Sequence, residues 1–174
     1  MPKYYTGAGD SGETSLFTGE RVSKYSPYMA ACGGLDELNS FLGLCKVTTK
    51  GNKDSLENIQ QDLFVIQAET AGADKHIQDE RTVWLEMIMA GIEKELPAIK
   101  NFIVPGGTEA AAMLDFARTI SRRAERRMVA VKEEGMVKIS NPTLKYLNRL
   151  SSLLYALARL VNVKAGVEEE KPHY

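Results

Sequence analysis

The chain has 174 residues, of which 44% are hydrophobic and 26% are charged, and its formal net charge is −1. These values are typical of one soluble globular domain, and the near-zero charge excludes a global attraction to nucleic acid or to an anionic membrane. Two cysteines, Cys32 and Cys45, make no disulfide framework, so we expect reduced core residues. No charged segment followed by an apolar run opens the sequence, which favours a cytoplasmic location.

Residues 1–26 are rich in glycine, threonine and serine and show no sustained periodicity. The sequence GAGDSG at 7–12 matches the G-x-G-x-x-G pattern of a dinucleotide-binding turn, but no buried strand precedes it and no amphipathic helix follows it. The lack of a following Gly-Lys-Ser/Thr also excludes a P-loop. We therefore expect an irregular loop, which either binds an anion through its amides and hydroxyls or is a flexible tail.

From residue 27 onward, apolar residues recur every three or four positions, which predicts amphipathic helices joined by short connections. The Pro-Gly segment at 101–108 interrupts this pattern, and Thr108 is a good cap for the helix that follows. The predicted fold is an all-α, five-helix bundle in a single domain, with a loop over 1–26, the bundle over 27–165 and a flexible tail over 166–174. The predicted helices begin at Pro27, Asp54, Gln78, Thr108 and Asn141 and end near Cys45, Ala73, Leu96, Glu134 and Val161.

Five arginines crowd the fourth predicted helix between residues 117 and 127. Arg118, Arg122 and Glu125 share one helical face beside the apolar row, so we expect that face to be partly buried and to need anionic partners. A solvated face with ion pairs is the simpler interpretation for Arg127, and an alternative for Arg123 and Arg126.

Three further residues are candidates for a site. Asp36 follows the core residue Leu35, and an arginine of the fourth helix is its obvious partner. Asn148 lies at the edge of the apolar stripe of the fifth helix, where a structural partner and a ligand are equally plausible. Phe102 lies in the Pro-Gly segment, where most aromatic side chains simply belong to the core.

Four stretches resemble, in the same order, the PduO-type ATP:cob(I)alamin adenosyltransferases. They are YTGAGDSGETSLFTGERVSK (5–24), GGLDELNSFLGL (33–44), FIVPGGTEAAAMLDFARTISRRAERR (102–127) and YLNRLSSLLYALAR (146–159). The resemblance implies a five-helix bundle that assembles as a homotrimer with ATP held between subunits. It also implies transfer of the 5′-deoxyadenosyl group of ATP to the cobalt of cob(I)alamin, with release of triphosphate.

The resemblance implies a set of site residues as well. Arg122 and Phe102, with Asp36 and Arg118, would be catalytic: Arg122 would stabilise the leaving charge. Phe102 would displace the lower axial ligand of cobalt, and Asp36 and Arg118 would form an inter-subunit salt bridge beside the corrinoid. Mg²⁺ would be held mainly by ATP oxygens, with Glu125 as a helper. The residues that would contact ATP are Thr6, Gly7, Ala8, Gly9, Thr14, Ser15, Lys24, Arg122, Arg123, Glu125, Arg126 and Asn148.

One residue departs from the family's pattern. Ala8 stands where relatives usually carry threonine, which removes one hydroxyl from the phosphate loop, so we expect weaker nucleotide affinity at most. The implied partners are a cob(II)alamin reductase and an adenosylcobalamin-dependent enzyme.

Two other functions remain open from the sequence. The chain could be a non-catalytic trimeric module that binds ATP and cobalamin or delivers the product. A bundle that binds nucleic acid through the arginines at 118–127 is the weaker alternative, because the net charge argues against it.

Overall fold

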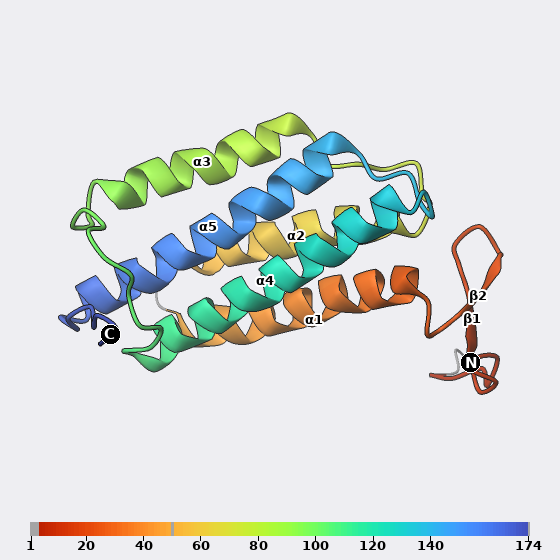
Figure 1. Ribbon diagram of the computed structural model, residues 1–174, viewed down its shortest axis with the longest axis horizontal. Helices are drawn as coiled ribbons and strands as arrows, with labels where there is room; N and C mark the ends of the chain where they lie inside the picture. The colour runs from red at the N-terminus through yellow and green to blue at the C-terminus, as the bar shows by residue number, and fades with distance from the viewer. Residues whose placement is uncertain (1–3, 50, 174) are drawn as a thin grey trace.

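The computed structural model describes residues 4–49 and 51–173. Its core is a bundle of five helices, which confirms the predicted fold class (Figure 1). In chain order the elements are β1 (Glu13–Ser15), β2 (Arg21–Ser23), α1 (Pro27–Thr48), α2 (Lys53–Thr70), α3 (Asp79–Glu93), α4 (Glu109–Glu133) and α5 (Asn141–Lys164). No helix within these described ranges is long and apolar enough to cross a membrane.

The N-terminal segment is not wholly irregular, which corrects the sequence-based prediction. β1 and β2 form an antiparallel hairpin in which Thr14 faces Val22. Gly19, with a φ of 86°, allows the tight turn between the strands, and the amide of Leu16 donates to the Glu20 carbonyl at 2.8 Å. Each strand has three residues, too short for the alternating pattern that reveals strands in a sequence.

Three of the helices begin where a side chain caps the first free amides. Ser26 accepts a hydrogen bond from the amide of Met29, Thr108 from that of Ala111, and Ser140 from that of Thr143. The beginnings of α1 and α4 therefore agree with the sequence-based prediction. The third helix ends at Glu93 rather than near Leu96, four residues before Pro97.

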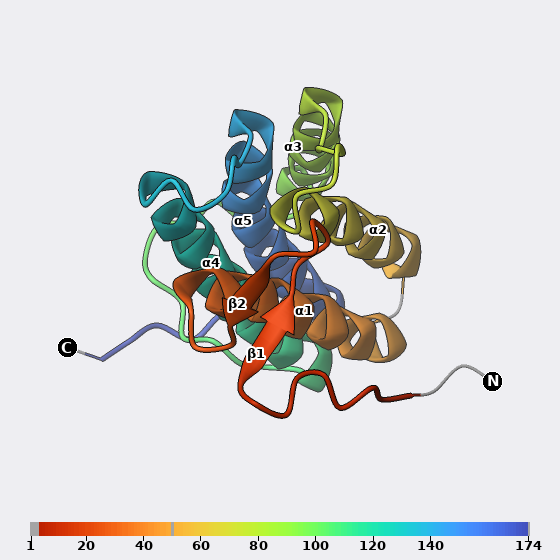
Figure 2. The same cartoon turned by 90° about the vertical axis from the view of Figure 1, so that its right-hand side faces the viewer.

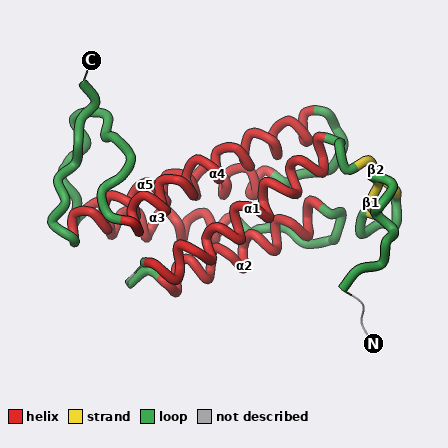
Figure 3. The backbone as a smooth tube through the Cα atoms, turned by 90° about the horizontal axis from the view of Figure 1, so that it is seen from below, coloured by secondary structure: helices red, strands yellow, loops and turns green. Residues whose placement is uncertain are grey.

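The bundle encloses one continuous apolar core to which all five helices contribute. α4 packs against both α1 and α5, while α2 and α3 complete the far side (Figures 1 and 2). Both cysteines are free, as expected, and burial raises the pKa of the Cys45 thiol to about 11. The β1–β2 hairpin and the C-terminal segment lie at opposite ends of the bundle (Figure 3).

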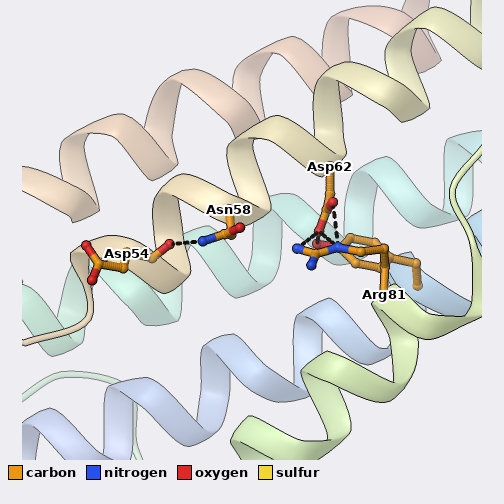
Figure 4. Close-up of polar contacts among 5 residues, drawn as sticks. Asp54, Asn58, Asp62 and Arg81 are labelled. Atoms are coloured by element: carbon orange, nitrogen blue, oxygen red, sulfur yellow. Dashed lines mark hydrogen bonds and ion pairs between the residues drawn. The ribbon is translucent and has the colours of Figure 1, made fainter.

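A buried carboxylate joins three of the helices. Asp62 of α2 accepts three hydrogen bonds from the guanidinium of Arg81 on α3, at 2.7 to 3.0 Å (Figure 4), and a fourth from the hydroxyl of Tyr146 on α5 at 2.7 Å. The Arg81 guanidinium also lies 4.3 Å from the centre of the Trp84 ring. Burial and the adjacent Asp62 raise the pKa of Tyr146, so its hydroxyl stays protonated and donates. Each charged group in this cluster therefore has a partner inside the fold.

The connection between α3 and α4 is held by α5 and by the C-terminal segment. Asn162 accepts a hydrogen bond from the amide of Thr108 at 2.9 Å and donates one to the carbonyl of Gly106 at 2.8 Å. Further along, the amide of Val104 donates to the Glu170 carbonyl at 2.8 Å, and the buried Arg159 forms an ion pair with Glu169. The segment expected to be a flexible tail thus makes specific contacts with the bundle.

Candidate active site

Two neighbouring hollows lie along the groove between α4 and α5. The larger, of about 930 Å³, lies between this groove, the 99–103 loop and the C-terminal segment. The smaller, of about 290 Å³, is lined by Arg122, Glu125, Arg126, Val129 and Asn148. Arg122 is the one residue that lines both hollows. A ligand in either hollow would therefore lie beside the same guanidinium.

The arginines of α4 differ in whether the fold provides them with a partner. Arg118 pairs with Asp115 at 3.3 Å, Arg123 pairs with Glu37 at 2.6 Å, and Arg127 donates to the carbonyl of Ala30 at 3.1 Å. Arg122 and Arg126 are exposed, and among residues 4–49 and 51–173 no hydrogen bond or ion pair engages either guanidinium. The two arginines that lack partners are those that line the smaller hollow. Such a pair is available to an anionic ligand.

The exposure of Arg122 corrects one expectation and the contact of Arg127 corrects another. We expected Arg122 to be partly buried with Arg118, but only Arg118 is, because the groove beside Arg122 is hollow rather than packed. We expected Arg127 to lie on a solvated face, but its guanidinium packs on α1, where Gly34 leaves room for it.

Glu125 and Asn148 face one another across the smaller hollow. The Asn148 amide donates to the Glu125 carboxylate at 2.9 Å, which joins α5 to α4. Asn148 is exposed rather than partly buried, again because this part of the groove is open. The sequence left a structural partner and a ligand as alternatives for Asn148, and the structure shows a structural partner whose position also lines the hollow.

The larger hollow combines apolar and cationic walls. Phe102 is 79% exposed and lies on its rim, so this ring is not a core residue. Across the hollow, the Arg118 guanidinium lies 6.0 Å from the centre of the Tyr155 ring. Burial is the main cause that raises the pKa of Tyr155, and its hydroxyl therefore stays neutral at physiological pH. Such a hollow suits a large ligand that has both apolar and polar surface.

The glycine-rich segment forms a compact loop whose cationic side chains fold onto it. Lys24 donates to the Gly9 carbonyl at 2.7 Å, and Arg21 donates to the Ala8 carbonyl at 3.0 Å and to the Ser15 hydroxyl at 3.3 Å. The hydroxyl of Thr6 accepts from the amide of Ala8, and the other predicted contacts, Gly7 and Thr14, lie in the same loop. This loop lies beyond the first turn of α1 (Figure 1), and in the described part of the chain no hydrogen bond joins it to α4. The structure of one chain therefore separates the two groups of predicted ATP contacts.

Comparison with known proteins decides the family. The family model described as cobalamin adenosyltransferase matches residues 4–161. The chain belongs to the cobalamin adenosyltransferase family. This confirms the resemblance that the four sequence stretches indicated.

Individual relatives agree with this cobalamin adenosyltransferase assignment. The corrinoid adenosyltransferase PduO of Citrobacter freundii is 44% identical over 164 residues, which cover 89% of this chain and 48% of that protein, so the chain spans about half its length. A corrinoid adenosyltransferase of Bacillus subtilis is 39% identical, with 95% of this chain and 89% of the relative covered. A solved variant of the PduO-type ATP:corrinoid adenosyltransferase from Lactobacillus reuteri, complexed with cobalamin and ATP, has a TM-score of 0.92 and 36% identity, and the match covers 98% of this chain and 97% of that one.

One predicted contact of the cobalamin adenosyltransferase site is not made within the chain. Asp36 is exposed, and Arg118 pairs with Asp115 rather than with Asp36. The acid of α1 that reaches α4 is its neighbour Glu37. One position along a helix rotates a side chain by about 100°, which turns Asp36 away from α4.

Sequence reasoning missed several residues that line the larger hollow. Tyr155 has a sequence signal, because this amphipathic side chain directly follows Leu154 at the edge of the leucine-rich stripe of the fifth helix. Lys171 and Pro172 have none, since their place in the wall depends on the contacts of Glu169 and Glu170 with residues far away in the sequence.

Proposed function

We propose that the protein transfers the 5′-deoxyadenosyl group of ATP to the cobalt of cob(I)alamin, giving adenosylcobalamin and triphosphate. The observation that carries this proposal is that two hollows of different character meet at one unpaired arginine, Arg122. The larger hollow has the size and the apolar rim for a corrinoid, and the smaller one presents two free guanidinium groups to a polyphosphate. The relatives' names and the ligands in the Lactobacillus reuteri structure support the same two substrates.

The reaction is a nucleophilic displacement in which the electron pair of Co(I) attacks C5′ of the ribose. The bond between cobalt and C5′ forms as the C5′–O bond breaks, and the electron pair of that bond leaves with triphosphate. The corrinoid supplies the nucleophile, so the protein's task is to align C5′ with cobalt and to stabilise the departing charge. Arg122 lies where the two substrates would meet and is suited to stabilise that charge.

The remaining contacts to ATP require a second copy of the chain. We infer that the loop at 6–15 with Lys24 binds the triphosphate on α4 of a neighbouring subunit, because among the described residues no hydrogen bond joins the loop to the α4 of its own chain. Asp36, exposed on α1, is free to pair with Arg118 of another subunit in the same homotrimer. Arg123 and Arg126, with Glu125 and Asn148, complete the nucleotide contacts.

A magnesium ion fits this site only as part of the nucleotide. In the described part of the chain no three potential ligands gather around a metal position, and Glu125 is the one carboxylate lining the smaller hollow. Mg²⁺ would therefore be held mainly by phosphate oxygens with Glu125 as a helper, and would offset phosphate charge. A cytoplasmic location, a cob(II)alamin reductase and an enzyme that consumes adenosylcobalamin complete the proposal.

Phe102 is proposed to act on the corrinoid itself. An exposed aromatic ring on the rim of the larger hollow would occupy the lower axial position and exclude the ligand there. Four-coordinate Co(II) is easier to reduce, so this exclusion would favour formation of the Co(I) nucleophile.

Turnover tests the proposed function directly. The protein is incubated with ATP, Mg²⁺ and chemically reduced cobalamin, while the cob(I)alamin absorbance and the release of triphosphate are followed. Loss of the absorbance with one triphosphate per adenosylcobalamin is the expected result. Tight binding of both substrates without decay above the protein-free control would contradict the proposal and identify a binding or delivery module.

A further inference from the structure

A chain of polar contacts leads from α3 across α5 to the smaller hollow. Glu86 of α3 accepts a hydrogen bond from Nε of Arg149 at 2.8 Å. Nη1 of Arg149 donates to Oδ1 of Asn148 at 3.0 Å, and Nδ2 of Asn148 donates to Glu125 at 2.9 Å. Asn148 and Glu125 line the hollow, whereas Glu86 and Arg149 do not. Two residues outside the site are therefore bonded in series to two residues inside it.

The chemistry of this chain fixes the direction of the Asn148 amide. A guanidinium carries only donors, so Arg149 donates to the carbonyl oxygen of the amide and cannot hydrogen-bond its NH₂ end. Glu125 as a carboxylate carries only acceptors and requires the opposite end. With Arg149 in place, the NH₂ group of Asn148 is thus directed toward Glu125 and the hollow. Without it, the single hydrogen bond to Glu125 is all that holds this orientation of an amide whose two ends have nearly the same shape.

We propose that Arg149, held by Glu86, is a positioning residue that keeps the NH₂ group of Asn148 directed toward bound ATP. This inference rests on the proposed function, since it assumes that the smaller hollow holds the nucleotide. A donor directed into the hollow matches a ligand whose polar surface consists mostly of acceptors, such as the ribose and phosphate oxygens of ATP. An amide turned over would present its carbonyl oxygen to those same acceptors and repel them.

A purely structural role explains Arg149 less well. Its side chain is 40% exposed and that of Glu86 is 43% exposed, and ion pairs this open contribute little to stability. Lys145 and Asp79 already join α5 to α3 one turn away, at 3.1 Å. Neither residue of this second pair lines the hollow, so the pair offers a matched control for helix docking alone.

The test compares Arg149→Met, Asn148→Ala, the double variant and Lys145→Met with the unchanged protein. ATP affinity is measured by calorimetry, the KM for ATP and kcat by turnover, and folding by thermal melting. For Arg149→Met we expect the Kd and KM for ATP to rise roughly three- to tenfold, the cost of one misdirected hydrogen bond, with kcat at saturating ATP within about twofold. In the Asn148→Ala background, the same replacement should cost nothing further.

Each outcome decides between the explanations. Equal effects of Arg149→Met and Lys145→Met would show that only helix docking is involved, and a full additional loss in the Asn148→Ala background would show direct contact with ATP; either result overturns the inference. Unchanged ATP affinity in Arg149→Met also overturns it, while the proposed function stands if Arg122→Ala still weakens binding. If the unchanged protein binds no ATP at all, the proposed function fails, and this inference fails with it.

Discussion

Two arginines of this bundle, Arg81 and Arg122, meet opposite surroundings. Arg81 lies against the Trp84 ring and makes three hydrogen bonds to the buried Asp62, which is also bonded to Tyr146. Arg122 is exposed between two hollows and has no partner among the described residues. The hydrogen bonds of the Arg81 guanidinium are made within the fold, whereas the Arg122 guanidinium is available to an anionic ligand.

The surroundings of Arg81 and Arg122 distinguish a charged side chain that serves the fold from one that is available to a ligand. A charged group whose partners are complete contributes to the specificity of packing, and its loss is felt in folding. A charged group that lines a hollow without a protein partner stays hydrated in the empty site and stabilises a ligand of opposite charge when that ligand binds. Variants at the two positions should therefore fail in different assays.

The largest expected effect is at the satisfied cluster. Asp62→Ala leaves the Arg81 guanidinium and the Tyr146 hydroxyl without their partner, and we expect the free energy of unfolding to fall by about 3 kcal/mol. Urea denaturation measures it. Turnover per folded molecule should be nearly unchanged at low temperature. A variant that is stable but inactive would show that Asp62 is needed for activity rather than for folding.

The open position should show the reverse behaviour. Arg122→Ala is expected to lower kcat by on the order of 10², because the leaving triphosphate loses a positioned cation, while the midpoint of urea denaturation stays unchanged. Arg127→Ala is the control, since it removes an arginine of the same helix whose donor is already used by Ala30. Normal turnover by Arg122→Ala would remove this residue from the mechanism.

The loop that carries Phe102 can be loosened without touching either arginine. At Gly107, φ is 93°, and a Cβ atom there would approach the Asn162 amide to 2.5 Å. Gly107→Ala should therefore destabilise the loop by roughly 2 kcal/mol, seen as faster amide hydrogen exchange over 101–108. The added methyl group would also displace Asn162, which is hydrogen-bonded to Thr108 and Gly106. Unchanged amide exchange rates over 101–108 would therefore show that these hydrogen bonds do not hold the loop in place.

A variant of Phe102 tests whether this side chain favours reduction of cobalt in the larger hollow. Phe102→Ala is expected to lower the rate from Co(II) about tenfold more than the rate from pre-reduced Co(I), a difference of about 1.4 kcal/mol between the two barriers. Phe64→Ala is a matched control, because Phe64 is also exposed but lies on α2 away from the hollow. Equal losses in the two assays would contradict the proposed role.

The smallest effect is expected at the departure from the family's pattern. Ala8→Thr restores one hydroxyl to the phosphate loop, and we expect the KM for ATP to fall about threefold, which corresponds to one modest hydrogen bond. Steady-state kinetics at varied ATP measures it. An unchanged KM would show that backbone amides alone serve this position.

The sequence predicts the helices well because their signals are local. Ser26 before Pro27 and Thr108 after two glycines mark helix beginnings that the structure confirms. The Asp62–Arg81 pair was not predicted, since it joins two helices and its residues are 19 apart in the sequence, a separation that carries no periodic signal. Arg122 stays a predicted site residue, but its predicted burial was wrong, because helical spacing shows which residues share a face and not whether a neighbouring helix fills the space beside it.

The position of Arg122 on the common wall of both hollows has a thermodynamic consequence. A molecule that neutralises this guanidinium from one side would change the field felt on the other, so we expect binding in the two hollows to be energetically linked. Linkage is reciprocal: whatever factor the nucleotide applies to the corrinoid's dissociation constant, the corrinoid applies to the nucleotide's. Through this single side chain, the affinity for one ligand would depend on whether the other is already bound.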